Sequence, residues 1–74
     1  MRWRTLQKKT MIDNILTNNA KIYLSISEIR DKIQQRFGVN LKYSEIRYVL
    51  EYSECMEEYS TSIYGGSVKY IKLS

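Results

Sequence analysis

The chain has 74 residues, a net charge of +4 and 43% hydrophobic residues, which is enough for one small globular domain with a modest core. It has no histidine and one cysteine, Cys55, so neither an intrachain disulfide nor the usual Cys/His zinc site can form within one chain. The sequence also lacks a Ser/His/Asp set and a glycine-rich phosphate loop, so we expect that it is not an enzyme. No signal peptide or long apolar run is visible, and we expect a cytoplasmic protein.

Positive charge is concentrated at the two ends of the sequence. Residues 1–10 carry +4, residues 11–41 carry +1, residues 42–58 carry −3 and the remainder carries +2. This balance suits an anionic partner. Residues 1–5 are a candidate flexible basic arm. Two interpretations stay open for Arg2, Arg4, Lys8 and Lys9: a frayed, solubilising terminus, or a basic arm that follows a phosphate backbone.

The first helix is predicted over residues 4–18, where Ile12, Ile15 and Leu16 fall on one face. The pair Asn18-Asn19 is expected to end it, because asparagine tolerates the left-handed conformation of a C-cap. Residues 21–24 follow as an extended link or a single short strand.

The second helix is predicted over residues 26–37. Ser25 and Glu28 have the spacing of a capping box, and Gly38 is a natural C-cap. The residues that share its apolar face are Ile26, Ile29, Ile33 and Phe37. Val39 and Leu41 then give the following turn two apolar anchors.

The third helix is predicted over residues 43–54, with Lys42 in the preceding turn or at its cap. Its inward-facing residues are Ile46, Val49 and Leu50. The positions most nearly opposite them, at about 100° per residue, are Ser44, Arg47, Tyr48 and Glu51.

Residues 56–73 are predicted to form a β-hairpin around a two-residue primed turn at Gly65-Gly66. The expected partners are Ile63 with Val68, Ser62 with Lys69 and Thr61 with Tyr70. This register places Ile71 and Leu73 on the face opposite Tyr70, a conflict that a bulge or a different loop length would resolve.

Two helices joined by a short turn that contains glycine form a helix-turn-helix, here within residues 25–53. Upstream lies the pattern Ile12-x-x-Ile15-Leu16, and downstream a hairpin that ends in Tyr70-Ile71-Lys72-Leu73. Over nearly its whole length the chain resembles the winged helix-turn-helix family. Its small size and its Ile/Lys/Tyr-rich composition most resemble the small winged-helix proteins of archaeal viruses and plasmids. The fold that this implies is a single α+β domain over residues 1–74, with three helices, a short strand after the first and a C-terminal hairpin wing.

The resemblance implies a double-stranded DNA-binding protein whose third helix enters the major groove. Arg47 can donate to guanine, and the hydroxyl and ammonium groups around it can contact phosphate. The residues that we expect at the DNA are Lys42, Tyr43, Ser44, Arg47 and Tyr48, the N-terminal Arg2, Arg4, Lys8 and Lys9, and Lys69 of the hairpin.

Three features depart from the family pattern. Glu45 and Glu51 lie on or beside the recognition face, where they repel phosphate unless Glu45 pairs with a base or a neighbouring cation. The wing tip, residues 62–67, has no arginine or lysine. The turn between the second and third helices is slightly long.

We therefore expect a sequence-specific DNA-binding protein that acts as a transcriptional regulator, in the host cytoplasm if the protein is viral. A homodimer is expected, with Trp3 and Leu6 at its interface, because a tryptophan near the end of a small chain is seldom left in water. A protein-interaction module with the same fold and a nonspecific architectural DNA binder are the alternatives. No cofactor, metal or small-molecule ligand is inferred.

Overall fold

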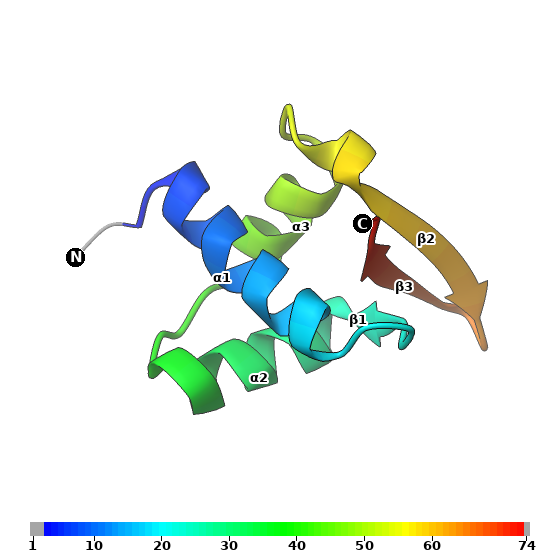
Figure 1. Ribbon diagram of the computed structural model, residues 1–74, viewed down its shortest axis with the longest axis horizontal. Coiled ribbons are helices and arrows are strands. Elements are labelled where there is room, and N and C mark those ends of the chain that lie inside the picture. Colours follow the sequence, from blue (N-terminus) through cyan, green and yellow to red (C-terminus); the bar gives the residue numbers. More distant parts are fainter. Residues whose placement is uncertain (1–2, 74) are drawn as a thin grey trace.

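The computed structural model describes residues 3–73, apart from the side chain of Tyr64. Over these residues the chain forms a small α+β domain with three α-helices, one 3-10 turn and a three-stranded antiparallel sheet (Figure 1). The elements are α1 (Thr5–Asn18), β1 (Leu24–Ser25), α2 (Ile26–Phe37), α3 (Tyr43–Glu51), η1 (Met56–Glu58), β2 (Tyr59–Tyr64) and β3 (Ser67–Lys72). Within residues 3–73 no helix is both long enough and apolar enough to cross a membrane.

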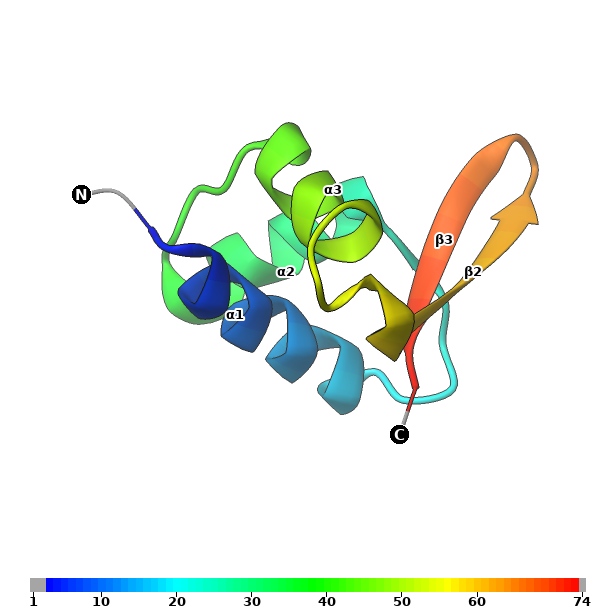
Figure 2. The ribbon, with the colours of Figure 1, turned by 90° about the horizontal axis from the view of Figure 1, so that it is seen from above.

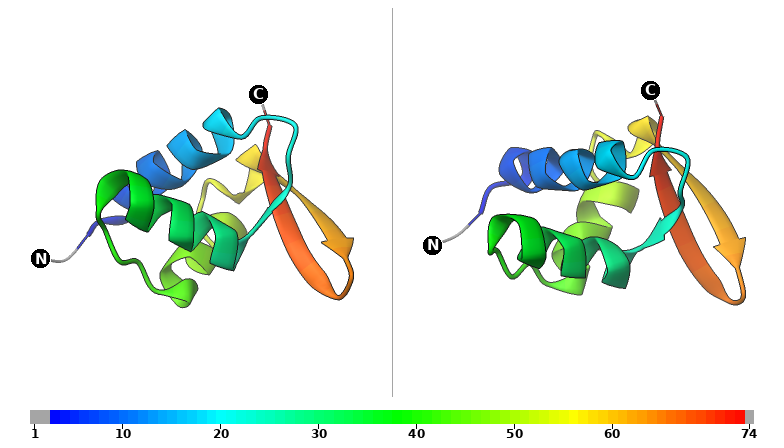
Figure 3. Two further views of the ribbon diagram at one scale, coloured as in Figure 1. Left: turned by 90° about the horizontal axis from the view of Figure 1, so that it is seen from below. Right: turned by 60° about the horizontal axis from the view of Figure 1, so that its bottom comes forward.

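The sheet is built around β3, which pairs with β1 on one side and with β2 on the other (Figure 3). The hairpin register predicted from the sequence is confirmed, since Ile63 pairs with Val68 and Thr61 with Tyr70. Gly65 and Gly66 have φ values of +58° and +82°, the left-handed conformations that the primed turn requires. Seen from above, the hairpin extends beyond the helices, at the end of the domain opposite the start of α1 (Figure 2).

The hairpin has neither a bulge nor a different loop length, the two features that would have resolved the conflict in its apolar pattern. Pairing runs without interruption from Tyr59 opposite Lys72 to Tyr64 opposite Ser67. The face that carries Tyr70 is the buried one, whereas Ile71 is half-buried and Leu73 is 49% exposed. The conflict in the apolar pattern is therefore resolved by leaving two apolar side chains partly in solvent.

The helix α2 begins and ends where the sequence predicts. The Ser25 hydroxyl accepts a hydrogen bond from the Glu28 amide at 3.2 Å, and the Glu28 carboxylate accepts one from the Ser25 amide at 3.1 Å. At the other end Gly38 adopts a φ of +67°, which leads the chain out of the helix.

The predicted end of α1 is correct in position and wrong in conformation. Asn19 has a φ of −116°, and its side-chain amide donates to the carbonyl of Ile15 at 2.7 Å. Because this hydrogen bond satisfies a carbonyl of the last turn, Asn19 needs no left-handed conformation. The left-handed residue is Lys21, with a φ of +71°.

The third helix is shorter than predicted, because α3 ends at Glu51 and not at residue 54. The Ser53 hydroxyl donates to the carbonyl of Val49 at 2.6 Å, and the Ser53 amide donates to the carbonyl of Tyr48 at 2.8 Å. These bonds close the last turn of the helix and redirect the chain. Residues 56–58, expected at the start of the hairpin, form the turn η1, and the strand begins only at Tyr59.

The core draws on every helix and on all three strands. Its buried members are Met11, Ile12, Ile15, Leu16, Leu24, Ile26, Ile29, Ile33, Leu41, Ile46, Val49, Leu50, Tyr59 and Tyr70. Phe37, predicted on the apolar face of α2, is instead 40% exposed. Leu41 is buried and Val39 packs against the core, so the turn covers this end of the core in place of Phe37.

The capping box of α2 generates a stability prediction. Ser25→Ala removes the hydroxyl that accepts from the Glu28 amide, and we expect it to lower the free energy of unfolding by about 1 kcal/mol. Ser27→Ala is the matched control, since Ser27 is exposed in the first turn of the same helix. Urea denaturation followed by circular dichroism measures both, and equal effects of the two substitutions would contradict the assignment of Ser25 as the cap.

Candidate nucleic-acid interface

One side of α3 is buried and the other is open to solvent. Ile46 and Val49 have no exposed surface, whereas Tyr43 and Tyr48 are 50% and 51% exposed. The other residues predicted to contact DNA through the third helix are Lys42, Ser44 and Arg47, all of them exposed. The structure therefore brings together four predicted residues of α3 and Lys42, its N-cap.

Arg47 is held against the surface of its own helix. Its Nε donates to Glu51 Oε2 at 2.7 Å and its Nη2 donates to the Tyr52 hydroxyl at 2.9 Å. The guanidinium carbon also lies 5.4 Å from the centre of the Tyr52 ring, in a cation–π arrangement. The other oxygen of Glu51, Oε1, accepts a hydrogen bond from the Tyr70 hydroxyl.

These contacts fix the charge states of both groups. Hydrogen bonding to Glu51 raises the pKa of Arg47, which stays protonated. Burial alone would raise the pKa of Glu51, but the hydrogen bonds from Tyr70 and Arg47 outweigh burial and hold it below its ordinary value. The pair is thus ionised at neutral pH.

The carboxylate of Glu45 faces α1 and is already paired there. Its Oε1 accepts from the backbone amide of Lys42 at 3.0 Å, and its Oε2 lies 2.9 Å from Lys8 Nζ. The pKa of Glu45 is held below its ordinary value mainly by the hydrogen bond from the Lys42 amide, and next by the hydrogen bond from the Lys8 side chain. The neighbouring cation that Glu45 needs in order not to repel phosphate is therefore Lys8.

Lys9 belongs to an ionic cluster that joins α1 to the base of the hairpin. Its Nζ lies 2.6 Å from Asp13 Oδ2 and 3.1 Å from Glu58 Oε2. The Tyr59 hydroxyl donates to Asp13 Oδ1 at 2.5 Å, and Lys72 lies within 3.7 Å of both carboxylates. The hydrogen bond to Asp13 is the main cause that raises the pKa of Lys9 to about 12.

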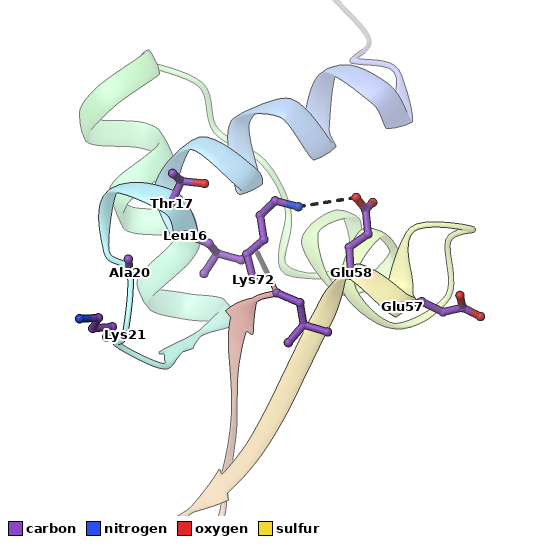
Figure 4. A pocket seen from close by; sticks show the side chains of 8 residues that line it. Leu16, Thr17, Ala20, Lys21, Glu57, Glu58 and Lys72 are labelled. Carbon is purple, nitrogen blue, oxygen red and sulfur yellow. Dashed lines mark ion pairs between the residues drawn. The ribbon is translucent and has the colours of Figure 1, made fainter.

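A hollow opens beside this cluster, between the end of α1 and η1. Its lining mixes aliphatic side chains such as Leu16 and Leu73 with the ion pair of Lys72 and Glu58 (Figure 4). Among residues 3–73 no three side chains of the His, Cys, Asp or Glu type gather closely enough to hold a metal ion.

The remaining residues predicted for the site are spread over the domain. Lys69 pairs with Glu28 at 3.8 Å, and Arg4 is the exposed N-cap of α1. Arg2 lies outside the described residues. Trp3 is half-buried against the core of its own domain, whereas Leu6 is 73% exposed.

The cations of α2 were not among the residues predicted from the sequence. Three of its exposed or half-buried residues form no ion pair with another described residue: Arg30, Lys32 and Arg36. The net charge of +1 over residues 11–41 hides them, because Asp13 and Glu28 in that segment pair with lysines of other segments. The sequence signal that indicates them is the spacing of Lys32 and Arg36, one helical turn apart, because two like charges at this spacing lie on the same side of a helix.

The lowered carboxylate pKa values predict loss of stability in acid. Since the pKa of Glu45 is lower in the folded state than its ordinary 4.5, the unfolded chain binds more protons as the pH falls. We expect the free energy of unfolding to be flat between about pH 5.5 and 7, where no histidine titrates, and to fall below about pH 4.5.

Glu45→Gln tests this at one residue. It should lower stability at pH 7 by about 0.2–1 kcal/mol and flatten the loss in acid. Glu54→Gln removes the same charge from an exposed residue that has no ion pair to a described residue. It should leave the loss of stability below pH 4.5 unchanged. Denaturant unfolding from pH 3 to 7 provides the measurement. An identical loss of stability in acid for the wild type and Glu45→Gln would refute the contribution of Glu45 to it.

No protein-family model matches this chain, and comparisons with curated proteins and with solved structures likewise found no similar protein. The geometry of α3 and its surroundings is therefore what supports a function.

Proposed function

We propose that the protein is a winged helix-turn-helix protein that binds double-stranded DNA through α3 and acts as a non-catalytic transcriptional regulator. The observation that carries the proposal is the exposed face of α3. Its side chains are an arginine, two tyrosines and a serine, on a helix whose opposite side is buried. The order of the elements supports it, since α2 and α3 are joined by residues 38–42 and followed by an antiparallel hairpin.

The chemistry of this face suits a groove of DNA. An α-helix about 10–12 Å across fits the major groove of B-DNA, which is about 12 Å wide. Arg47 has N–H donors left for the O6 and N7 acceptors of guanine, whereas Tyr43 and Ser44 can donate to phosphate. Lys42 and the backbone amides at the start of α3 favour an anion at that end of the helix.

The internal ion pairs do not oppose binding strongly. Those of Lys8 and Lys69 are partly exposed, and such pairs contribute about 1 kcal/mol or less, so a phosphate can replace the carboxylate at little cost. The cations of α2 supply further charge, and each phosphate that they neutralise steepens the salt dependence by roughly 0.9 in log–log slope.

A protein-interaction module is the second candidate, and the tip of the hairpin favours it. Ile63 is 76% exposed and its cross-strand neighbour Val68 is 40% exposed, with no cation on residues 62–67. An apolar tip of this kind suits a protein surface better than a phosphate backbone.

Arg47→Ala tests the DNA proposal. Two probes are needed: a 30-bp duplex enriched from a random pool by the wild-type protein, and an unselected duplex of the same length. We expect Arg47→Ala to weaken binding to the enriched duplex by roughly 5- to 150-fold, and to the unselected duplex much less, because a base contact carries sequence information. Lys21→Gln, which removes one positive charge from the loop after α1, should weaken both slightly and equally.

The outcomes separate the candidates. Absence of binding to any duplex at 50 mM salt would leave the protein-interaction module as the function. Binding that is strong but equal on the two duplexes would indicate a nonspecific architectural binder. If Arg47→Ala lowered the affinity for both duplexes equally, Arg47 would not be a base-contacting residue.

We also propose a homodimer, for which Leu6 is the residue to test. Trp3 already packs against its own core, which leaves Leu6 as the exposed apolar side chain near the start of α1. We expect a sedimentation mass of two chains for the wild type and of one chain for Leu6→Lys. Ile22→Lys is the control, since Ile22 is 54% exposed in the loop after α1, and a wild-type mass of one chain would overturn the proposal.

A further inference from the structure

We propose that Glu51 is a positioning residue for Arg47, and that through Tyr70 it ties the orientation of the Arg47 side chain to the hairpin. This inference rests on the proposed function and extends it, since it names a residue that determines sequence selectivity without contacting a base itself.

One carboxylate accepts from two elements that are distant in sequence. Glu51 Oε2 accepts from Arg47 Nε at 2.7 Å, and Oε1 accepts from the hydroxyl of Tyr70 in β3. The Tyr70 side chain has no exposed surface, and its strand is paired on both sides. The Tyr70 hydroxyl is therefore held in one position. Because the Glu51 carboxylate is hydrogen-bonded to this hydroxyl, it constrains the position of the Arg47 guanidinium as well.

Tyr52 holds the same guanidinium from a second direction. Its hydroxyl accepts from Arg47 Nη2 at 2.9 Å and its ring lies 5.4 Å from the guanidinium carbon. An arginine has five N–H groups, so three remain after these two bonds, and they lie on Nη1 and Nη2 at the tip of the side chain. The tip can meet two acceptors, such as O6 and N7 of guanine, while both internal contacts persist.

Holding Arg47 in this way favours selectivity at the expense of general affinity. A long side chain that is already ordered loses less conformational freedom when it binds. It binds best to acceptors that lie where its N–H groups already point. The ionised carboxylate of Glu51, 27% exposed, at the same time repels phosphate of any sequence. Removing that carboxylate should therefore change the two properties in opposite directions.

The test compares Glu51→Gln with Glu54→Gln on the enriched and unselected 30-bp duplexes. We expect Glu51→Gln to strengthen binding to the unselected duplex by roughly threefold, and to lower the ratio of enriched to unselected affinity by roughly tenfold. Glu54→Gln removes the same charge three residues later and should leave the ratio unchanged. A loss of folding would weaken both probes together, so a fall in the ratio with a gain on the unselected duplex is not a structural effect.

Two further variants test the connection. In the Arg47→Ala background, Glu51→Gln should change the ratio no further, since there is no guanidinium left to position. Tyr70→Phe keeps the buried ring and removes the hydroxyl, and it should lower the ratio less than Glu51→Gln does. A thermal melt of each variant shows whether it is folded.

A DNA-independent measurement separates failure of this inference from failure of the proposed function. The Arg47 Nε–H resonance of the free wild-type protein should be shifted and protected from exchange, a signal that Glu51→Gln removes and Glu54→Gln keeps. Wild-type protein that binds no duplex overturns both proposals. Wild-type protein that binds selectively, with an unchanged ratio in Glu51→Gln or no protected Arg47 signal, overturns this inference alone.

Discussion

The burial of Tyr70 in the middle of β3 holds the helices and the hairpin in one arrangement. Its strand pairs with β1 and with β2, and its ring has no exposed surface among side chains of the core. Its hydroxyl reaches Glu51 at the end of α3. The orientation of the open face of α3 is thus coupled to the central strand.

Three of the seven cations predicted to meet a partner also join elements of the domain. Lys8 joins α1 to α3, Lys9 joins α1 to η1, and Lys69 joins β3 to α2. A charge count along the sequence therefore differs from the distribution of charge on the surface. The described cations that form no ion pair lie at the start of α1, in the loop after it, on α2 and at the start of α3. In the proposed complex with DNA, these cations would contribute to the salt dependence of binding.

Features that depend on local chemistry were predictable. The capping box and Gly38 set the bounds of α2, and the paired glycines set the register of the hairpin. The errors occur where tertiary contacts decide. Ser53 ends α3 by bonding to backbone carbonyls, and Leu41 takes the place expected for Phe37. The periodicity of α3 likewise predicted which residues share its open face, but the contact of Glu51 with Tyr70 joins residues 19 positions apart and leaves no trace in a helical pattern.

The central position of β3 also affects the order of events during synthesis. Leu24 of β1 has its strand partner in Tyr70, and Asp13 has its hydrogen-bond partner in Tyr59, so neither contact exists until the hairpin has left the ribosome. The three helical segments lack this part of their core for a time on the order of a second, at ordinary rates of translation. Folding of a domain this small can be faster than that, so synthesis of the hairpin and not the search for contacts would limit the rate at which the domain becomes native.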